Sequence, residues 1–143
     1  MSVNQIALKQ SDLDFKRSFT DHSLPEPDFT HESYLRMGWI YIAQYSLTDA
    51  IDIFAEDLKE YTQAVESAHR FNMTSTWLYL MLINECQQRS EGTSWETFKL
   101  NNPDLFQPPK ELLSQYYSEG KLSSEKARHE VVLPDLISVG QLA

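Results

Sequence analysis

Two stretches of the chain are apolar on every side of the helix that each is expected to form. The first covers residues 30–45 with the run 39–42 at its centre, and the second covers 72–89 with the run 77–83. A helix without a polar face is a buried helix, so both are expected at the centre of the fold. Residues 47–65 instead show apolar positions spaced three and four apart, which predicts an amphipathic helix that packs one face against them.

Polar residues mark where these helices begin. Thr30 and Asn72 are good N-caps for the two buried helices, and Ser46 with Asp49 resembles a capping box in front of the amphipathic helix. Further caps and prolines indicate two or three short helices in the C-terminal part, over about 93–101, 110–117 and 123–129.

No strand pattern is present, so the sequence predicts an all-α fold. We expect a single-domain, up-down helical bundle of about three main helices plus two or three short C-terminal helices. Residues 1–29 form an N-terminal arm with a short helical turn that packs on the body, 30–136 form the helical domain, and 137–143 form a loosely held tail. Because short connections make consecutive helices antiparallel neighbours, the two buried helices should begin at the same end of the molecule.

That end gathers polar side chains, and we take it as the candidate site. Polar groups in the first turns of a buried helix must find partners inside the protein or bind something there. Arg36 would bind an anionic group, and His31 would donate or accept a hydrogen bond or transfer a proton. The candidate catalytic residues are His31, Arg36 and Tyr34, and the candidate ligand-binding residues are Asn72, Thr74, Thr76, Trp39 and Trp77.

Each candidate also has a purely structural interpretation. Arg36 would instead form a salt bridge with an internal acid such as Glu85 or Asp135. His31 would be a partly exposed residue of the first helical turn. The threonines would bond their own backbone, Asn72 would serve as a cap, and the tryptophans would belong to the core.

Composition excludes several classes of function. The net charge is −9, and no Lys or Arg cluster suited to nucleic acid is present, so we expect neither nucleic acid nor a membrane as partner. Cys86 is the single cysteine and the four histidines are scattered, which argues against a disulfide framework and against a conventional zinc site. No phosphate-binding loop or nucleophile motif occurs. We expect no metal and no cofactor, and we expect a cytoplasmic protein because no signal peptide or membrane-spanning run is visible.

Several motifs together resemble a group of small uncharacterised bacterial helical proteins. They are F-T-H at 29–31, L-R-x-x-W at 35–39, T-x-T at 74–76, L-L-x-x-Y-Y-S at 112–118 and P-D-L at 134–136. The resemblance covers most of the chain and implies no established activity. Tyr34 stands where the group has a second histidine, and Asn72-Met73 stands where it has His-Glu. The residues that remain fit a polar or anion pocket better than a metal centre, and they also fit a divergent enzyme that uses His31 with Tyr34.

The sequence therefore favours a protein that binds a small polar or anionic ligand, and it leaves open whether a reaction follows. The alternative is a protein–protein interaction or accessory module without catalytic activity, either as a homodimer or with another protein. That alternative predicts an exposed apolar patch, for which residues 116–117 or 131–133 are the candidates.

Overall fold

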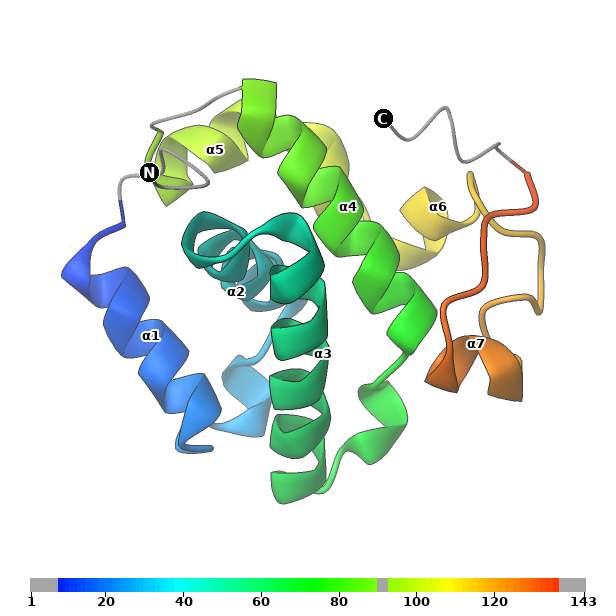
Figure 1. Ribbon diagram of the computed structural model, residues 1–143, viewed down its shortest axis with the longest axis horizontal. Coiled ribbons are helices and arrows are strands. Elements are labelled where there is room, and N and C mark those ends of the chain that lie inside the picture. Colours follow the sequence, from blue (N-terminus) through cyan, green and yellow to red (C-terminus); the bar gives the residue numbers. More distant parts are fainter. Residues whose placement is uncertain (1–7, 90–92, 137–143) are drawn as a thin grey trace.

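The computed structural model describes residues 8–89 and 93–136, and no strand occurs within them. The α-helices are α1 (Gln10–Thr20), α2 (His31–Gln44), α3 (Leu47–Ala64), α4 (Met73–Arg89), α5 (Trp95–Asn101), α6 (Pro109–Leu113) and α7 (Glu125–His129). Three single turns of 3-10 helix precede α2, α4 and α6: η1 (Glu26–Asp28), η2 (Ala68–Arg70) and η3 (Pro103–Phe106). The all-α fold, with three main helices followed by short ones, confirms the prediction from the hydrophobic pattern (Figure 1).

The main helices begin where their caps predicted. Thr30 Oγ1 accepts a hydrogen bond from the backbone N of Ser33 at 3.2 Å, and Asn72 Oδ1 accepts one from Ser75 N at 3.0 Å. Ser46 caps α3 in the same way. Each of these bonds satisfies a backbone donor that the helix itself leaves free, which fixes the position of the first turn.

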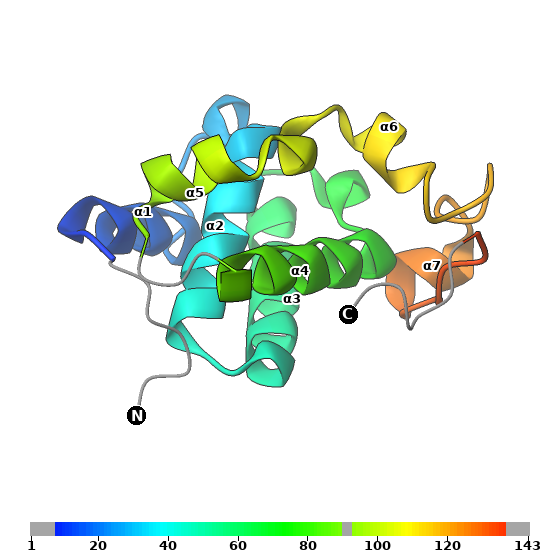
Figure 2. The same ribbon diagram turned by 90° about the horizontal axis from the view of Figure 1, so that it is seen from above.

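The three main helices cross one another at the centre of the molecule. Figure 1 shows α2 largely along its axis, whereas α3 and α4 run across the view, and Figure 2 shows α2 from the side. A Cβ atom at Gly38 of α2 would lie 2.7 Å from Leu80 Cδ2 and 3.1 Å from Ile83 Cδ1 of α4. The small glycine therefore allows α2 and α4 to approach closely, and the run 39–42 is completely buried around this contact.

The expected N-terminal arm contains a full helix, α1, in place of a single turn. This helix packs on α2 and α3. Phe19 near its C-terminal end is completely buried and contacts the rings of Phe29 and Tyr61, with centroids 5.5 Å and 5.1 Å away. The aromatic contacts make α1 part of the core.

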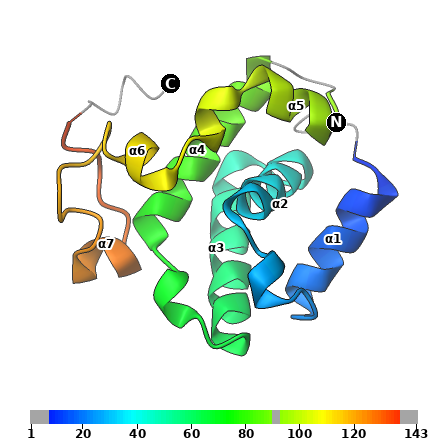
Figure 3. The ribbon, with the colours of Figure 1, turned by 180° about the vertical axis from the view of Figure 1, so that it is seen from behind.

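The C-terminal helices cover one face of the central three. Figure 3 shows the segment from α5 to α6 passing in front of α4, and the ring of Trp95 in α5 lies 5.5 Å from that of Trp39 in α2. Helix α6 ends at Leu113, earlier than the sequence predicted, and the chain continues in turns before α7. The residues expected to form a loose tail, 137–143, lie outside the described part of the chain.

Candidate functional site

A cavity of about 230 Å³ opens between the N-terminal halves of α2 and α4. Phe29 after η1, Arg70 of η2, helix α6 and the C-terminal half of α3 complete its walls. We call it the His31 cavity. Its lining residues are Phe29, His31, Tyr34, Leu58, Thr62, Arg70, Ser75, Thr76, Tyr79, Pro109 and Leu113.

His31 is the first residue of α2, and its cap places the imidazole ring against the cavity. The ring nitrogen Nε2 is buried and has no hydrogen-bond partner. Burial lowers the pKa of His31, and the backbone of Leu105 opposes that shift only in part. The imidazole is therefore neutral near pH 7.

Tyr79 also lines the cavity, and it has a second unpartnered polar group. The residue is 2% exposed, and its hydroxyl is buried without a hydrogen-bond partner. Burial raises the pKa of Tyr79, so the hydroxyl stays a neutral phenol. The Tyr79 ring meets the His31 ring edge-on with centroids 5.3 Å apart, and it meets Tyr34 in the same way at 5.6 Å. Three aromatic rings thus form one wall of the cavity.

Tyr34 and Thr76 carry the other hydroxyls of this wall, and both are satisfied. Thr76 is buried and donates its hydroxyl proton to the backbone oxygen of Asn72 at 2.8 Å. Tyr34 forms a side-chain hydrogen bond with Thr76, while burial raises the pKa of Tyr34. These hydroxyls therefore contribute a fixed polar surface, whereas His31 and Tyr79 contribute groups that need a partner.

Arg70 is the one charged side chain among the described lining residues, and its charge is already paired. Its Nη1 lies 2.7 Å from Glu26 Oε2, and its Nη2 donates to the backbone oxygen of Phe29 at 2.7 Å. The guanidinium also lies over the Phe29 ring, 5.4 Å from its centroid. The cavity therefore has a largely neutral interior.

Arg36, which the sequence suggested as an anion-binding residue, lies outside this cavity. Its Nη2 and Nε atoms lie 2.7 Å and 3.1 Å from Asp12 Oδ1 of α1, and the guanidinium stacks over Phe15. The suggested acid partners Glu85 and Asp135 were wrong, because the partner is Asp12. Five residues separate Arg36 from His31, a rotation of about 140° around the helix, so the two side chains leave α2 on different sides.

The remaining predicted residues take structural roles around the site. Trp39 is completely buried and its Nε1 donates to Gln87 at 3.3 Å, and Trp77 packs in a smaller cluster around Leu78 and Tyr117. Asn72 caps α4 and donates from Nδ2 to the backbone oxygen of Leu122 at 2.8 Å. None of these three predicted residues lines the His31 cavity.

Thr74 connects α4 to the segment that contains α7. Its buried hydroxyl lies 2.8 Å and 2.7 Å from the backbone oxygens of Ala127 and Glu130, and it accepts a hydrogen bond from Val132 N at 3.0 Å. Of the eight predicted residues, the structure therefore brings together His31, Tyr34 and Thr76.

Sequence reasoning missed Tyr79 and Ser75, although their spacing carried a signal. Tyr79 lies three residues after Thr76 and four after Ser75, which places all three on one face of a helix. The apolar residues around Tyr79 concealed it, because in sequence it appears as one more core aromatic residue.

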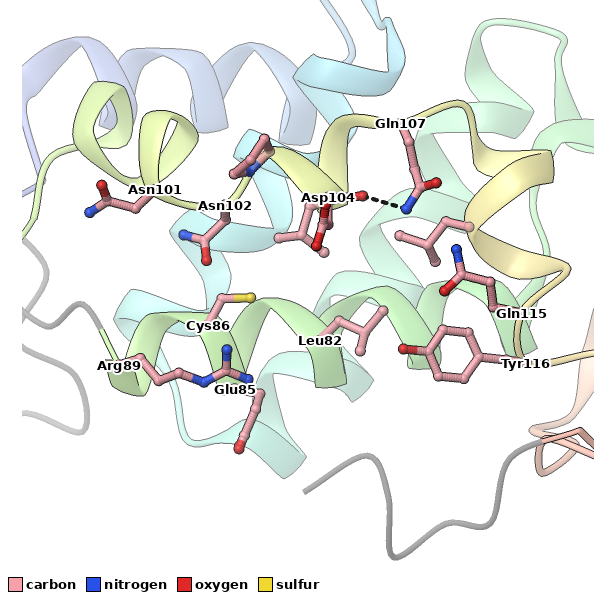
Figure 4. A pocket seen from close by; sticks show the side chains of 13 residues that line it. Leu82, Glu85, Cys86, Arg89, Asn101, Asn102, Asp104, Gln107, Gln115 and Tyr116 are labelled. Carbon is pink, nitrogen blue, oxygen red and sulfur yellow. Dashed lines mark hydrogen bonds between the residues drawn. The ribbon is translucent and has the colours of Figure 1, made fainter.

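A larger, polar hollow lies on the other side of η3, and we call it the α4 groove (Figure 4). It measures about 560 Å³, and Figure 4 shows Leu82 and Cys86 of α4 facing Asn102 and Asp104. Gln107 donates to the backbone oxygen of Asp104 at 2.9 Å, and Asn102 donates to that of Phe98. No buried, unpartnered side-chain atom of the described chain belongs to a residue that lines it. Size alone therefore does not make this groove the better candidate.

Cys86 in this groove lacks the features of a reactive thiol. Burial raises its pKa, with Arg89 opposing the shift only in part. A cysteine nucleophile needs the opposite shift, because the thiolate is the reactive form.

Comparisons with protein-family models, curated proteins and solved structures gave no match. Within residues 8–89 and 93–136, no three His, Cys, Asp or Glu side chains gather in a way that could hold a metal ion. None of the helices described is long and apolar enough to cross a bilayer. The His31 cavity is therefore the feature of the molecule from which a function can be inferred.

Proposed function

We propose that this protein is a cytoplasmic binding protein for a small polar molecule, which it holds in the His31 cavity. The observation that carries the proposal is that two residues lining one cavity, His31 and Tyr79, each have a buried polar atom without a hydrogen-bond partner. Most buried polar groups in native proteins have a hydrogen-bond partner, and an unpaired one costs about 1–3 kcal/mol. A ligand that bonds both groups would recover part of that free energy.

The size of the cavity supports a ligand larger than water. A water molecule occupies about 30 Å³ in the liquid, and the His31 cavity has about 230 Å³. Phe29, Leu58 and Leu113 supply apolar contact among the lining residues. A few placed polar groups within apolar walls are typical of small-molecule sites.

Binding can be tested by titrating the isotope-labelled protein with separate small molecules of each charge type: phosphate, acetate, glycine, an alcohol and an amide. We expect at least one of them to shift the backbone amide signals of Ser75, Thr76 and Tyr79 in a saturable manner. The Ser75→Phe variant should abolish these shifts, because the new ring would occupy the cavity while Asn72 still caps α4. Ser11→Phe on the exposed side of α1 is the matched control. Shifts that are absent throughout the panel, or that persist in Ser75→Phe, would contradict the proposal.

A protein–protein contact is the second candidate function, and exposed apolar side chains in the C-terminal segment favour it. Val131, Leu133 and Leu136 are 38%, 55% and 54% exposed. The other expected patch is absent, because Tyr117 is buried and Tyr116 is half-buried. Sedimentation of the protein and of Leu133→Glu separates the candidates, since a self-association through this segment would be lost in the variant.

A further inference from the structure

A further hollow, which we call the basic hollow, lies where the C-terminal part of α3, the η2 segment and α7 meet (Figure 1). It measures about 430 Å³, and half of its described lining residues are basic: Lys59, His69, Arg128 and His129. We infer that this hollow binds the phosphate group of a small organic phosphate monoester. The inference goes beyond the proposed function, because none of these four residues lines the His31 cavity.

No carboxylate offsets the positive charge inside the basic hollow, since its described lining residues include no Asp or Glu. The side chains of Lys59, His69 and Arg128 form no ion pair and no hydrogen bond with another described residue. His129 is partly engaged, because its Nε2 lies 3.2 Å from Glu125 Oε2. Two full positive charges and at least one imidazole are therefore available to a ligand.

These basic residues come from three separate segments, and only the folded chain brings them to one place. Lys59 belongs to α3 and His69 to η2, whereas Arg128 and His129 end α7, which the hydroxyl of Thr74 ties to α4. The helix dipole favours cations at a helix C-terminus, which accounts for the basic pair of α7 taken by itself. It does not account for a hollow that also contains Lys59 and His69.

The chemistry of these side chains suits a doubly charged oxyanion. Lys59 and Arg128 each carry a positive charge near pH 7, and a phosphate monoester carries about −1.5 to −2. An arginine fork donates two parallel hydrogen bonds to phosphate oxygens, and an imidazole donates another through its N–H. A carboxylate has a single charge and two oxygens, so it would leave part of this set without a partner.

The size and surroundings of the basic hollow favour a small organic molecule. Its volume of about 430 Å³ lies within the range of about 300–1,000 Å³ that is typical of small-molecule sites. Phe71, which lies under the Lys59 ammonium at 5.7 Å, adds an apolar wall for the organic part. The net charge of −9 repels long polyanions, which disfavours nucleic acid and acidic peptides as the ligand.

Five probes test the inference in NMR titrations of the full chain at pH 7: phenyl phosphate, benzoate, benzylamine, benzyl alcohol and inorganic phosphate. The backbone amides of Ala68, His69, Arg128 and His129 report binding at the basic hollow. We expect phenyl phosphate to shift them in a saturable manner and to bind about tenfold or more tighter than benzoate. Benzylamine and benzyl alcohol should leave these amides unchanged. Inorganic phosphate should bind more weakly than phenyl phosphate, because it lacks the ring.

Two charge variants identify the residues that hold the phosphate. Arg128→Gln and Lys59→Gln each remove one positive charge without breaking an ion pair among the described residues. Each should weaken phenyl phosphate binding about fivefold or more, and Lys59→Gln serves alone if Arg128→Gln does not fold. Lys126→Gln is the matched control, because it removes a positive charge from α7 at a residue that does not line the basic hollow. It should change binding by less than about twofold.

Several outcomes would overturn the inference. They are the absence of shifts with every probe, benzoate or inorganic phosphate binding as tightly as phenyl phosphate, and an equal loss of binding in Lys126→Gln and the two charge variants. Shifts confined to Ser75, Thr76 and Tyr79 would place the probe in the His31 cavity, which would overturn this inference and leave the proposed function standing. Binding at the basic hollow that persists in Ser75→Phe would support this inference whatever becomes of the proposed function.

Discussion

Tyr79 and Tyr41 are two buried tyrosines whose hydroxyls have opposite surroundings. The Tyr41 hydroxyl donates to Asp57 Oδ2 at 2.6 Å, whereas the Tyr79 hydroxyl has no partner. We expect Tyr41→Phe to lower the free energy of unfolding by about 1.5–3 kcal/mol, the usual value of a bond to a charged group. Tyr79→Phe should leave it unchanged or raise it by up to about 1 kcal/mol, because it removes an unpaired group.

Urea unfolding of the two variants beside the wild type measures this difference. Phenylalanine matches the size of tyrosine, so lost packing does not obscure the comparison. If Tyr79→Phe loses as much stability as Tyr41→Phe, the Tyr79 hydroxyl has a strong partner in solution and the main argument for the cavity fails.

At this scale the sequence predicted part of the site and misplaced the rest. His31, Tyr34 and Thr76 line the cavity. The sequence could group these residues because helix caps and helix order are local signals, and they place both helix starts at one end of the molecule. Arg36 was grouped with them by its nearness along the chain, although its angle around α2 directs it to Asp12. The surroundings of Tyr79 come from residues of α2 and α6 that are distant in sequence, so only the folded structure reveals that its hydroxyl lacks a partner.

Among the helices, α1 is held to α2 by an ion pair in which one partner is almost completely buried. The Asp12 side chain is 3% exposed and that of Arg36 is 25% exposed. Arg36→Met would leave the Asp12 carboxylate with the backbone N of Lys9, 2.9 Å away, as its remaining partner. We expect this variant to lose about 3 kcal/mol of stability, because a buried charge then lacks its counter-charge.

The double variant Asp12→Asn/Arg36→Met distinguishes this cause from lost packing. Asparagine keeps an oxygen for Lys9 N but carries no charge. We expect the double variant to be more stable than Arg36→Met alone in thermal or urea unfolding. Equal stability of the two would show that the stem of Arg36 over Phe15, and not its charge, secures α1.

The segment around α7 depends on one hydroxyl of α4. Thr74→Val preserves shape but removes the group that contacts Ala127, Glu130 and Val132. We expect a loss of about 1–3 kcal/mol. Amide hydrogen exchange should accelerate at Val132 and in α7, while amides in the middle of α2 keep their protection.

Ser124→Ala is the comparison for this variant, since it removes only local hydrogen bonds, the cap of α7 at Ala127 N and the bond to the backbone oxygen of Lys121. It should speed exchange in α7 without affecting Val132. Uniform acceleration throughout α2 in Thr74→Val would contradict a local role for Thr74.

The sequence predicted the main helices better than the peripheral ones. Caps at Thr30, Ser46 and Asn72 are local, and they placed the starts of α2, α3 and α4 correctly. Helix α1 was underestimated because the residues that stabilise it, Phe29, Tyr61 and Arg36, are distant in sequence. The crossing of α2 and α4 depends on the contact at Gly38, which a hydrophobic pattern does not encode.

For the whole molecule, burial of His31 links stability to pH. Burial lowers its pKa from the ordinary 6.5, so in mild acid the unfolded chain binds a proton that the folded protein does not bind. This contribution is complete above pH 6.5 and decreases as the pH falls below that value, by at most about 1.4 kcal/mol per pH unit. We expect the wild type to lose more stability between pH 7.5 and 5.5 than His31→Gln does.

Urea unfolding of both proteins at the two pH values provides the measurement. The other three histidines, His22, His69 and His129, are exposed and are common to both proteins, so their contributions cancel in the difference. Equal losses in the two proteins would mean that His31 is accessible to solvent when the protein is folded.

The order of the helices also has a consequence for how the chain folds and opens. Helices α2, α3 and α4 are consecutive and joined by short connections, so their mutual contacts form between neighbouring parts of the chain and close at low entropic cost. We therefore expect the part of the His31 cavity on α2 and α4 to assemble early, whereas its wall on α6 is added by a later part of the chain. We expect α6 to detach and return by local unfolding while the central helices stay intact, which gives a small molecule a route into the cavity.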